Sequence, residues 1–282
     1  MSIPIDGIYV INLDSRPERW NNFSAQSHLW EQTFGKQPQR LRAVFGVQLK
    51  GFGKSPWFTK RISEKRRKSW GGKAGCILSH RNALQLAHES QLANVMVVED
   101  DAFLPDDFPE KWQHGLKNLI EELPEDWAVL YFCTTQAFAP SRCIKQMGET
   151  KLIESSGALG AVTYLVNGKI LPKLLAELPT EETIWPWVAR HKTIDRWLSQ
   201  NLMRFGRVFL FAPSLAGHDS VGSSDTSMTA ENDAMLDFSL NDISFCNNSL
   251  SFNILRFIRL ILNTLKRNTS IARQLQKKVR GL

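Results

Sequence analysis

The feature that most constrains the fold is a regular alternation of short apolar runs with segments of helical periodicity. The apolar runs are rich in β-branched and aromatic residues and are typical of buried strands. We expect these strands within residues 5–13, 39–46, 94–98, 127–134 and at the starts of 157–178 and 208–226. We expect helices within residues 14–26, 71–91, 108–124 and 193–201 and at the end of 157–178. Strands that alternate with helices indicate an α/β domain with a mostly parallel central sheet.

The length and the cysteines limit the classes of protein that the chain can belong to. With 282 residues, 43% of them hydrophobic, the chain can form one large domain or two small ones with a substantial core. None of its cysteines (Cys76, Cys133, Cys143 and Cys246) lies in a C-x-x-C pair, so we expect reduced, mostly buried thiols. The sequence shows neither a signal peptide nor an apolar run of about 18 residues, so we expect a cytoplasmic protein.

The net charge of +7 is concentrated in the C-terminal tail. Residues 253–282 contain eight Lys or Arg and no acid, and without them 27 basic residues face 28 acidic ones. The high isoelectric point therefore arises from the tail, and it does not favour nucleic-acid binding by the whole chain. Within the tail, apolar residues are interleaved with Arg256 and Arg259, which predicts a basic amphipathic helix able to lie on an anionic bilayer. A helix packed on the domain or in a dimer is the alternative.

Three carboxylates, Glu99, Asp100 and Asp101, directly follow the apolar run at 94–98. Ligands of open α/β sheets bind outside the carboxyl ends of the strands. Carboxylates clustered at such an end raise one another's pKa unless a cation intervenes. Mg²⁺ and Mn²⁺ prefer carboxylate oxygens and keep coordination positions for water and phosphate. The pattern therefore indicates a metal site suited to a phosphorylated substrate, with a solvated turn as the alternative.

Six motifs in a fixed order resemble those of glycosyltransferase family 25, which includes lipopolysaccharide, lipooligosaccharide and collagen galactosyltransferases. They are VINLDSRPERW, GGKAGCILSHRNAL, VMVVEDDAFL, GALGAVTYLVNGKILPKLL, TIDRWL and GHDSVGSSDT. The resemblance covers roughly residues 5–226 and implies a GT-A-like nucleotide-sugar-binding domain, which we place at 1–227. We expect an irregular linker at 228–252 and the basic amphipathic helix at 253–282.

The resemblance implies an inverting transfer of a hexose, galactose from UDP-galactose, onto a lipopolysaccharide or other surface saccharide. Mn²⁺ or Mg²⁺ is expected between the diphosphate and Glu99 and Asp101, with His218 as a third ligand. Such a cation neutralises the charge that develops on the leaving diphosphate. Asp195 in TIDRWL matches an acid of the family and is the expected general base, with Asp100 as the alternative. The enzyme is expected at the inner face of the membrane, held there by its tail.

The family also implies a donor-binding set near the first and third motifs. Asn12 and Asp14 are expected to bond the base or ribose, and Arg16 and Arg19 to reach phosphate, unless the arginines form ordinary surface ion pairs. The full donor-binding set that we expect is Asn12, Asp14, Arg16, Arg19, Lys73, Ser79 and Asp100. Lys73 stands where family members usually carry Glu, and this exchange reverses a charge near the site.

Residues 48–70 are rich in Gly, Lys, Arg and Ser and predict a long loop, whose Trp57, Phe58 and Trp70 could stack on sugars. Two other functions stay open. Lys73 keeps open a non-catalytic sugar- or nucleotide-binding relative that acts as an assembly partner. Nucleic-acid binding through the basic tail is the third function, and it would weaken steeply with salt.

Overall fold

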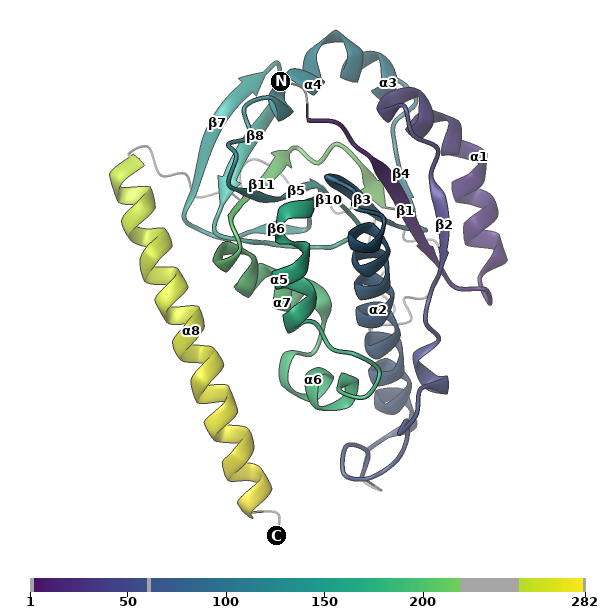
Figure 1. The fold of residues 1–282 in the computed structure, drawn as a ribbon, viewed down its shortest axis with the longest axis vertical. Coiled ribbons are helices and arrows are strands. Elements are labelled where there is room, and N and C mark those ends of the chain that lie inside the picture. Colours follow the sequence, from purple (N-terminus) through teal and green to yellow (C-terminus); the bar gives the residue numbers. More distant parts are fainter. Residues whose placement is uncertain (1–2, 60–61, 219–248, 281–282) are drawn as a thin grey trace.

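The computed structural model describes residues 3–59, 62–218 and 249–280, and the side chains of the last helix up to residue 265. A central sheet with helices on both faces forms the body, and one long helix, α8, lies along its side (Figure 1). The eight strands follow the order β2-β1-β3-β10-β5-β11-β8-β7. Their bounds are β1 Gly7–Asn12, β2 Gln39–Arg42, β3 Asn94–Glu99, β5 Trp127–Cys133, β7 Ser141–Met147, β8 Thr150–Ser155, β10 Thr163–Asn167 and β11 Arg207–Ala212.

Six of the eight strands of the central sheet point in one direction. Strands β2, β1 and β3 pair in parallel, and so do β5 and β11. Strands β10 and β8 run the other way and pair antiparallel with their neighbours. The mostly parallel sheet expected from the sequence is therefore present, with two reversed strands inserted in it. Two small sheets, β4 (Ala102–Phe103) with β12 (Gly217–His218) and β6 (Gln136–Ala137) with β9 (Ala158–Leu159), flank it.

Helices cover both faces of this sheet, as an α/β fold requires. Helices α1, α3 and α4 pack on one face around Phe23, Trp30 and Trp112, and helices α2, α5, α6 and α7 pack on the other. The helices are α1 Pro17–Phe34, α2 Glu64–Glu89, α3 Phe108–Lys111, α4 Lys117–Ile120, α5 Leu171–Glu177, α6 Ile184–His191, α7 Ile194–Asn201 and α8 Ser249–Arg280. Short turns of helix lie at η1 Gly46–Gln48, η2 Trp112–Leu116, η3 Gly168–Ile170 and η4 Leu202–Arg204.

Helix α2 begins well before the glycines that were expected to open it. It starts at Glu64, where the Ser63 hydroxyl accepts a hydrogen bond from the backbone N–H of Arg66. Glycines cost a helix interior about 1 kcal/mol each relative to Ala, but Gly75 serves close packing here. A Cβ at Gly75 would lie 2.3 Å from the backbone oxygen of Val44. The glycines therefore let the segment before η1 lie directly on the helix.

The prediction of a long loop at 48–70 was wrong for its last seven residues and for the role of Phe58 and Trp70. Residues 64–70 belong to α2. Phe58 is buried and packs edge-to-face against Phe52, Trp70 and Trp185 with ring centroids 5.0–5.7 Å apart. These rings form a core cluster, so Phe58 and Trp70 are not exposed platforms for a sugar.

The helix expected at 108–124 is interrupted. Helix α3 passes into the π-helical turn η2, and α4 ends at Ile120. Gly115 has a φ of 146°, which a residue with a side chain rarely adopts. A Cβ there would lie 2.7 Å from the Met147 sulfur. The kink thus makes room for strand β7.

The sequence analysis missed the hairpin β7–β8 and its buried carboxylate. Glu154 on β8 is 1% exposed and accepts hydrogen bonds from Arg142 and Arg207 at 2.7–2.8 Å. Arg256 of α8 lies 3.5 Å from the same carboxylate. Burial alone would raise the pKa of Glu154, but the hydrogen bonds and charges of Arg207 and Arg142 lower it below its usual range.

Replacing Glu154 with Gln is expected to lower the free energy of unfolding at pH 7 by about 1.5–3 kcal/mol, because the arginines lose their buried charged acceptor. A depressed pKa stabilises the fold above the unfolded pKa of 4.5, and this contribution is lost as the pH falls through the folded pKa. The difference in the free energy of unfolding between wild type and Glu154→Gln should therefore shrink below pH 4.5. Urea unfolding over this pH range measures it. Exposed Glu149→Gln on the same hairpin is the control, and an equal loss there would contradict the account.

Candidate functional site

The carboxyl ends of β1 and β3 lie side by side, with Ile11 paired to Glu99, so the polar residues after both strands meet. Asn12 is 1% exposed and donates a hydrogen bond of 2.6 Å to Oδ2 of Asp100. Its amide oxygen accepts from Arg40 on β2 at 2.6 and 2.9 Å. In this arrangement Asn12 ties three strand ends together and orients Asp100.

The charged residues after β1 form a network with the acids after β3. Arg19 donates to Oδ1 of Asp100 at 3.1 Å and lies 3.4 Å from Oδ2 of Asp101. Asp14 pairs with Arg40 at 3.1 Å and with Arg42. Arg16 lies 3.6 Å from Glu18. Both oxygens of Asp100 therefore accept hydrogen bonds from the protein, so this carboxylate serves to position its neighbours and is the weaker candidate for a base.

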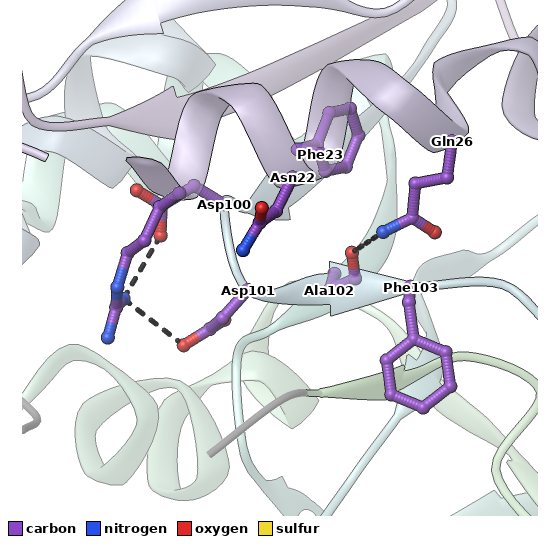
Figure 2. A pocket seen from close by; sticks show the side chains of 8 residues that line it. Asn22, Phe23, Gln26, Asp100, Asp101, Ala102 and Phe103 are labelled. Carbon is purple, nitrogen blue, oxygen red and sulfur yellow. Dashed lines mark hydrogen bonds and ion pairs between the residues drawn. The ribbon is translucent and has the colours of Figure 1, made fainter. Parts of the chain in front are cut away.

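A pocket of about 180 Å³ opens beside this network, between α1 and β4 (Figure 2). Asp100 and Asp101 lie at one end of the pocket, and Phe103 and Gln26 lie at the other. Gln26 fixes β4 against α1 through hydrogen bonds of 3.2 Å to the backbone of Ala102 and Leu104. The pocket is smaller than the roughly 300 Å³ at which small-molecule sites usually begin. It suits a phosphate-sized group and not a whole nucleotide sugar.

Asp101 carries a buried oxygen that lacks a protein donor. Its Oδ1 finds no hydrogen-bond partner among the residues that the structure describes. Burial, and next the charge of Glu99, raise the pKa of Asp101 to about 7, against the lowering effect of Arg19. A half-buried carboxylate with a buried, unsatisfied oxygen and like charges nearby fits a divalent cation. Asp101 is therefore the residue of this site that is best suited to hold Mn²⁺ or Mg²⁺.

The three metal ligands expected from the sequence come close in the fold without forming one cluster. His218 on β12 pairs with Ala102 on β4, one residue from Asp101. The Glu99 side chain, however, turns toward α2, where its Oε1 lies 3.2 Å from Nε2 of His80. Within the described part of the chain, the group whose ligand atoms all lie within 4.8 Å of one another is Cys76, His80 and Glu99. Glu99 and Asp101 thus have different partners, His80 for the first and Arg19 for the second. Asp219, which follows His218, is outside the described residues.

Helix α2 supplies two further residues of the expected donor-binding set. The hydroxyl of Ser79 is buried, donates to the backbone oxygen of Gly75 at 2.7 Å and accepts from the backbone N–H of Val44 at 2.8 Å. Ser79 therefore joins α2 to the segment before η1. Lys73 is half-buried, and its pKa is lowered by burial and then by the charges of Lys192, Arg66 and Arg196.

Asp195 lies in the first turn of α7, where the helix dipole favours a carboxylate. Its Oδ1 accepts a hydrogen bond of 2.7 Å from the backbone N–H of Arg196. After desolvation and the charge of Glu99, the charge of Asp195 helps to raise the pKa of the half-buried Cys76 thiol, and it opposes the lowering of the pKa of Lys73. Asp195 therefore lies near Cys76 and Lys73 of α2. Lys73 itself is surrounded by more positive than negative charge.

The sequence analysis missed several buried hydroxyls in the central sheet. The side-chain oxygens of Tyr131, Thr134 and Thr163 are buried without a hydrogen-bond partner in the ranges that the structure describes. Burial, and next the charge of Asp195, raise the pKa of Tyr131 well above its usual range. Tyr131 lies in a run of apolar residues, so its hydroxyl left no pattern by which it could be recognised.

Comparisons with known proteins give a family and include similarities to solved structures. The model of glycosyltransferase family 25 (LPS biosynthesis protein) matches residues 5–182. No curated protein matches the chain. Among solved structures, the crystal structure of mannose-1-phosphate geranyltransferase from Thermus thermophilus is 12% identical, covers 72% of each chain and has a TM-score of 0.31. A similarity of this size carries no argument about function. The family match includes Asp101 and ends before Asp195 and His218.

Proposed function

The chain belongs to glycosyltransferase family 25, and on this premise we propose that it transfers galactose from UDP-galactose onto a lipopolysaccharide or other surface saccharide. Membership makes it a glycosyltransferase of LPS biosynthesis. The GT-A-like character of the domain, the hexose, the metal and the inverting stereochemistry are parts of the proposal. The observation that carries the proposal is Asp101, whose buried, unsatisfied oxygen lies at the carboxyl edge of the sheet within the matched residues.

Asp101 would hold the divalent cation, Mn²⁺ or Mg²⁺, and His218, which pairs with the neighbouring Ala102, is the candidate for a second ligand. Glu99 could join them only by turning away from His80. The cation would neutralise the negative charge that builds up on the diphosphate as it leaves. Arg19 already contacts Asp100 and Asp101, so its guanidinium lies where a diphosphate would approach them. Asp100 and Asn12 hold this arrangement in place through their mutual hydrogen bond.

Asp195 is proposed as the general base of a direct displacement. The acceptor hydroxyl oxygen attacks the anomeric carbon, its proton passes to Asp195, and the bond from the anomeric carbon to the diphosphate oxygen breaks with its electron pair leaving on UDP. Attack on the face opposite the leaving group inverts the anomeric carbon. The cations around Lys73 lie beside Asp195 and favour a phosphorylated donor or acceptor over a neutral one.

Thermal denaturation with a panel of nucleotide sugars, with and without Mn²⁺, tests the donor part of this proposal. UDP-galactose with Mn²⁺ should raise the melting temperature more than other donors, since a ligand that binds only the folded state stabilises it. Stabilisation by a donor without sugar transfer would favour the alternative function, a non-catalytic protein that binds the sugar or nucleotide. No stabilisation by any donor would contradict the proposal.

We further propose that α8 lies on an anionic membrane surface. Its first turns are attached to the body by buried Phe252 and by Arg256 and Arg259, whose guanidinium groups face Glu154 and the backbone oxygen of Ala139. The apolar side chains point outward: Leu250, Ile254, Leu255, Phe257, Ile258, Ile261, Leu262 and Leu265 are exposed. Residues 266–282 add six Lys or Arg and no acid, which complements an anionic bilayer. No helix in the described ranges is long and apolar enough to cross a membrane.

Replacing Phe257 with Asp should reduce binding to phosphatidylglycerol vesicles about tenfold or more, because burying one large apolar side chain contributes about 1.5–3 kcal/mol. Cosedimentation with such vesicles and with neutral phosphatidylcholine vesicles measures the effect. The matched control is Phe45→Asp, which changes an exposed phenylalanine of the body. Equal vesicle binding by wild type and Phe257→Asp would contradict the proposal.

A further inference from the structure

Cys76, His80 and Glu99 form a cluster whose contacts differ from those between Arg19 and Asp101. Cys76 and His80 are four residues apart on α2, so they share one face of the helix. Glu99 ends β3, and its Oε1 lies 3.2 Å from Nε2 of His80. The thiol, the imidazole and the carboxylate place their ligand atoms within 4.8 Å of one another. These are three different metal-ligating groups that converge from two separate elements.

The imidazole of the cluster is held by a second partner. His80 is 1% exposed, and its Nδ1 lies 2.9 Å from the hydroxyl of Tyr164 on β10. The two rings stack with centroids 5.8 Å apart. Metal-binding histidines usually bond their other ring nitrogen to a carboxylate, a backbone carbonyl or water, which fixes the orientation of the ring. The Tyr164 hydroxyl takes that place here. With Nδ1 engaged by Tyr164, Nε2 is directed at Glu99 and is the atom available to a cation.

We propose that Cys76, His80 and Glu99 bind a borderline transition-metal dication, Zn²⁺ by preference, at a site separate from the cation on the donor diphosphate. Sulfur and nitrogen ligands select Zn²⁺ over Mg²⁺ and Mn²⁺, which favour oxygen. Three protein ligands leave a fourth position for water. On binding, the Cys76 sulfur forms a bond to the metal and its proton passes to solvent, with no change of oxidation state.

This site would join α2 to the end of β3 and would fix the direction of Glu99. The contact with His80 is made by Oε1 of Glu99, two residues before Asp101 in the sequence. Glu99 would therefore link the Zn²⁺ site to the donor site, and Asp101 would not be a ligand of the Zn²⁺. The proposal concerns binding of a metal by this chain, and it stands or falls independently of sugar transfer.

Cobalt(II) is the probe, because a thiolate bound to Co²⁺ gives a charge-transfer band that oxygen and nitrogen ligands do not. The reduced full-length protein should bind one Co²⁺ with this band, and Zn²⁺ should displace it. Cys76→Ser should abolish the band and weaken Zn²⁺ binding, measured against a chelating dye, by more than about 100-fold, since the loss of a mere supporting residue already costs 10–100-fold. Cys143→Ser changes an exposed cysteine and should keep the band.

A band that is absent in the wild type, or that persists in Cys76→Ser, would overturn the proposal. Asp101→Asn keeps all three ligands and should keep the band, whatever its effect on UDP-galactose binding. A folded Asp101→Asn variant without the band would show that the thiolate site is not independent and would also overturn it. Circular dichroism of each variant shows that a lost band does not arise from unfolding.

Discussion

Asp101→Asn is expected to lower the rate of sugar transfer roughly 10³-fold, at the upper end of the effect of removing one preorganised electrostatic contact. Asparagine keeps the shape of the side chain but cannot supply the negative charge that would hold a cation at the buried Oδ1. Mn²⁺-dependent stabilisation by UDP-galactose should be lost in the same variant. Initial rates of UDP release with acceptor present measure the first effect, and thermal denaturation measures the second.

The same substitution should not unfold the protein. The pKa of Asp101 is raised to about 7 from 3.8, so in metal-free protein its contribution to stability is fully present below pH 3.8 and is lost as the pH rises through 7. At pH 8 the folded wild type must hold Asp101 as a charged carboxylate, which lowers its stability. The neutral amide of Asp101→Asn removes this cost, so the metal-free variant should melt at or above the temperature of the wild type. Asp106→Asn, an exposed acid just beyond β4, is the matched control and should transfer sugar normally. Wild-type turnover in Asp101→Asn would remove Asp101 from the mechanism.

Asp195→Asn is expected to reduce kcat for transfer by about 10²–10⁴-fold, which is the usual contribution of a positioned general base. Its effect should differ from that of Asp101→Asn, because a base acts on the acceptor and not on the donor. Mn²⁺-dependent stabilisation by UDP-galactose should therefore survive in Asp195→Asn.

Steady-state kinetics with saturating donor and a varied acceptor measure kcat and KM for this variant. Glu181→Gln, an exposed acid outside the site, serves as the control. A kcat within a few-fold of the wild type would show that Asp195 is a first-turn acid favoured by the helix dipole and that the base is a different residue.

The sequence predicted the parts of the fold that depend on local apolar pattern. The runs at 5–13, 94–98 and 127–134 became β1, β3 and β5, because continuous β-branched and aromatic residues suit strands buried on both faces. Parallel strands bring their carboxyl ends to one edge, so the meeting of Asn12 with Asp100 followed from topology. The roles assigned to the site residues, and the domain bounds at 228–252, remain predictions.

The sequence could not predict features that depend on contacts between distant segments. Hairpin β7–β8 carries Arg142, Lys145, Lys151 and Glu154, so its sequence lacks the apolar pattern of a buried strand. The buried charge of Glu154 is neutralised by Arg207 and Arg256, which come from distant segments. The glycines of α2 suggested a helix start, whereas they allow close packing against the segment before η1. The direction of Glu99 depends on His80, which is 19 residues earlier in the sequence. The spacing of Cys76 and His80 places both on one face of α2 but does not indicate a contact with Glu99.

The most direct test of the central claim is the release of UDP from UDP-galactose by the purified wild-type protein without acceptor. A metal-dependent transferase should hydrolyse this donor slowly with Mn²⁺, stop when EDTA is added and resume when Mn²⁺ is restored. Hydrolysis that is insensitive to EDTA would contradict the assignment of a divalent cation to Asp101. Binding of UDP-galactose with no release of UDP, with or without a saccharide acceptor, would contradict the claim that this chain is a working galactosyltransferase.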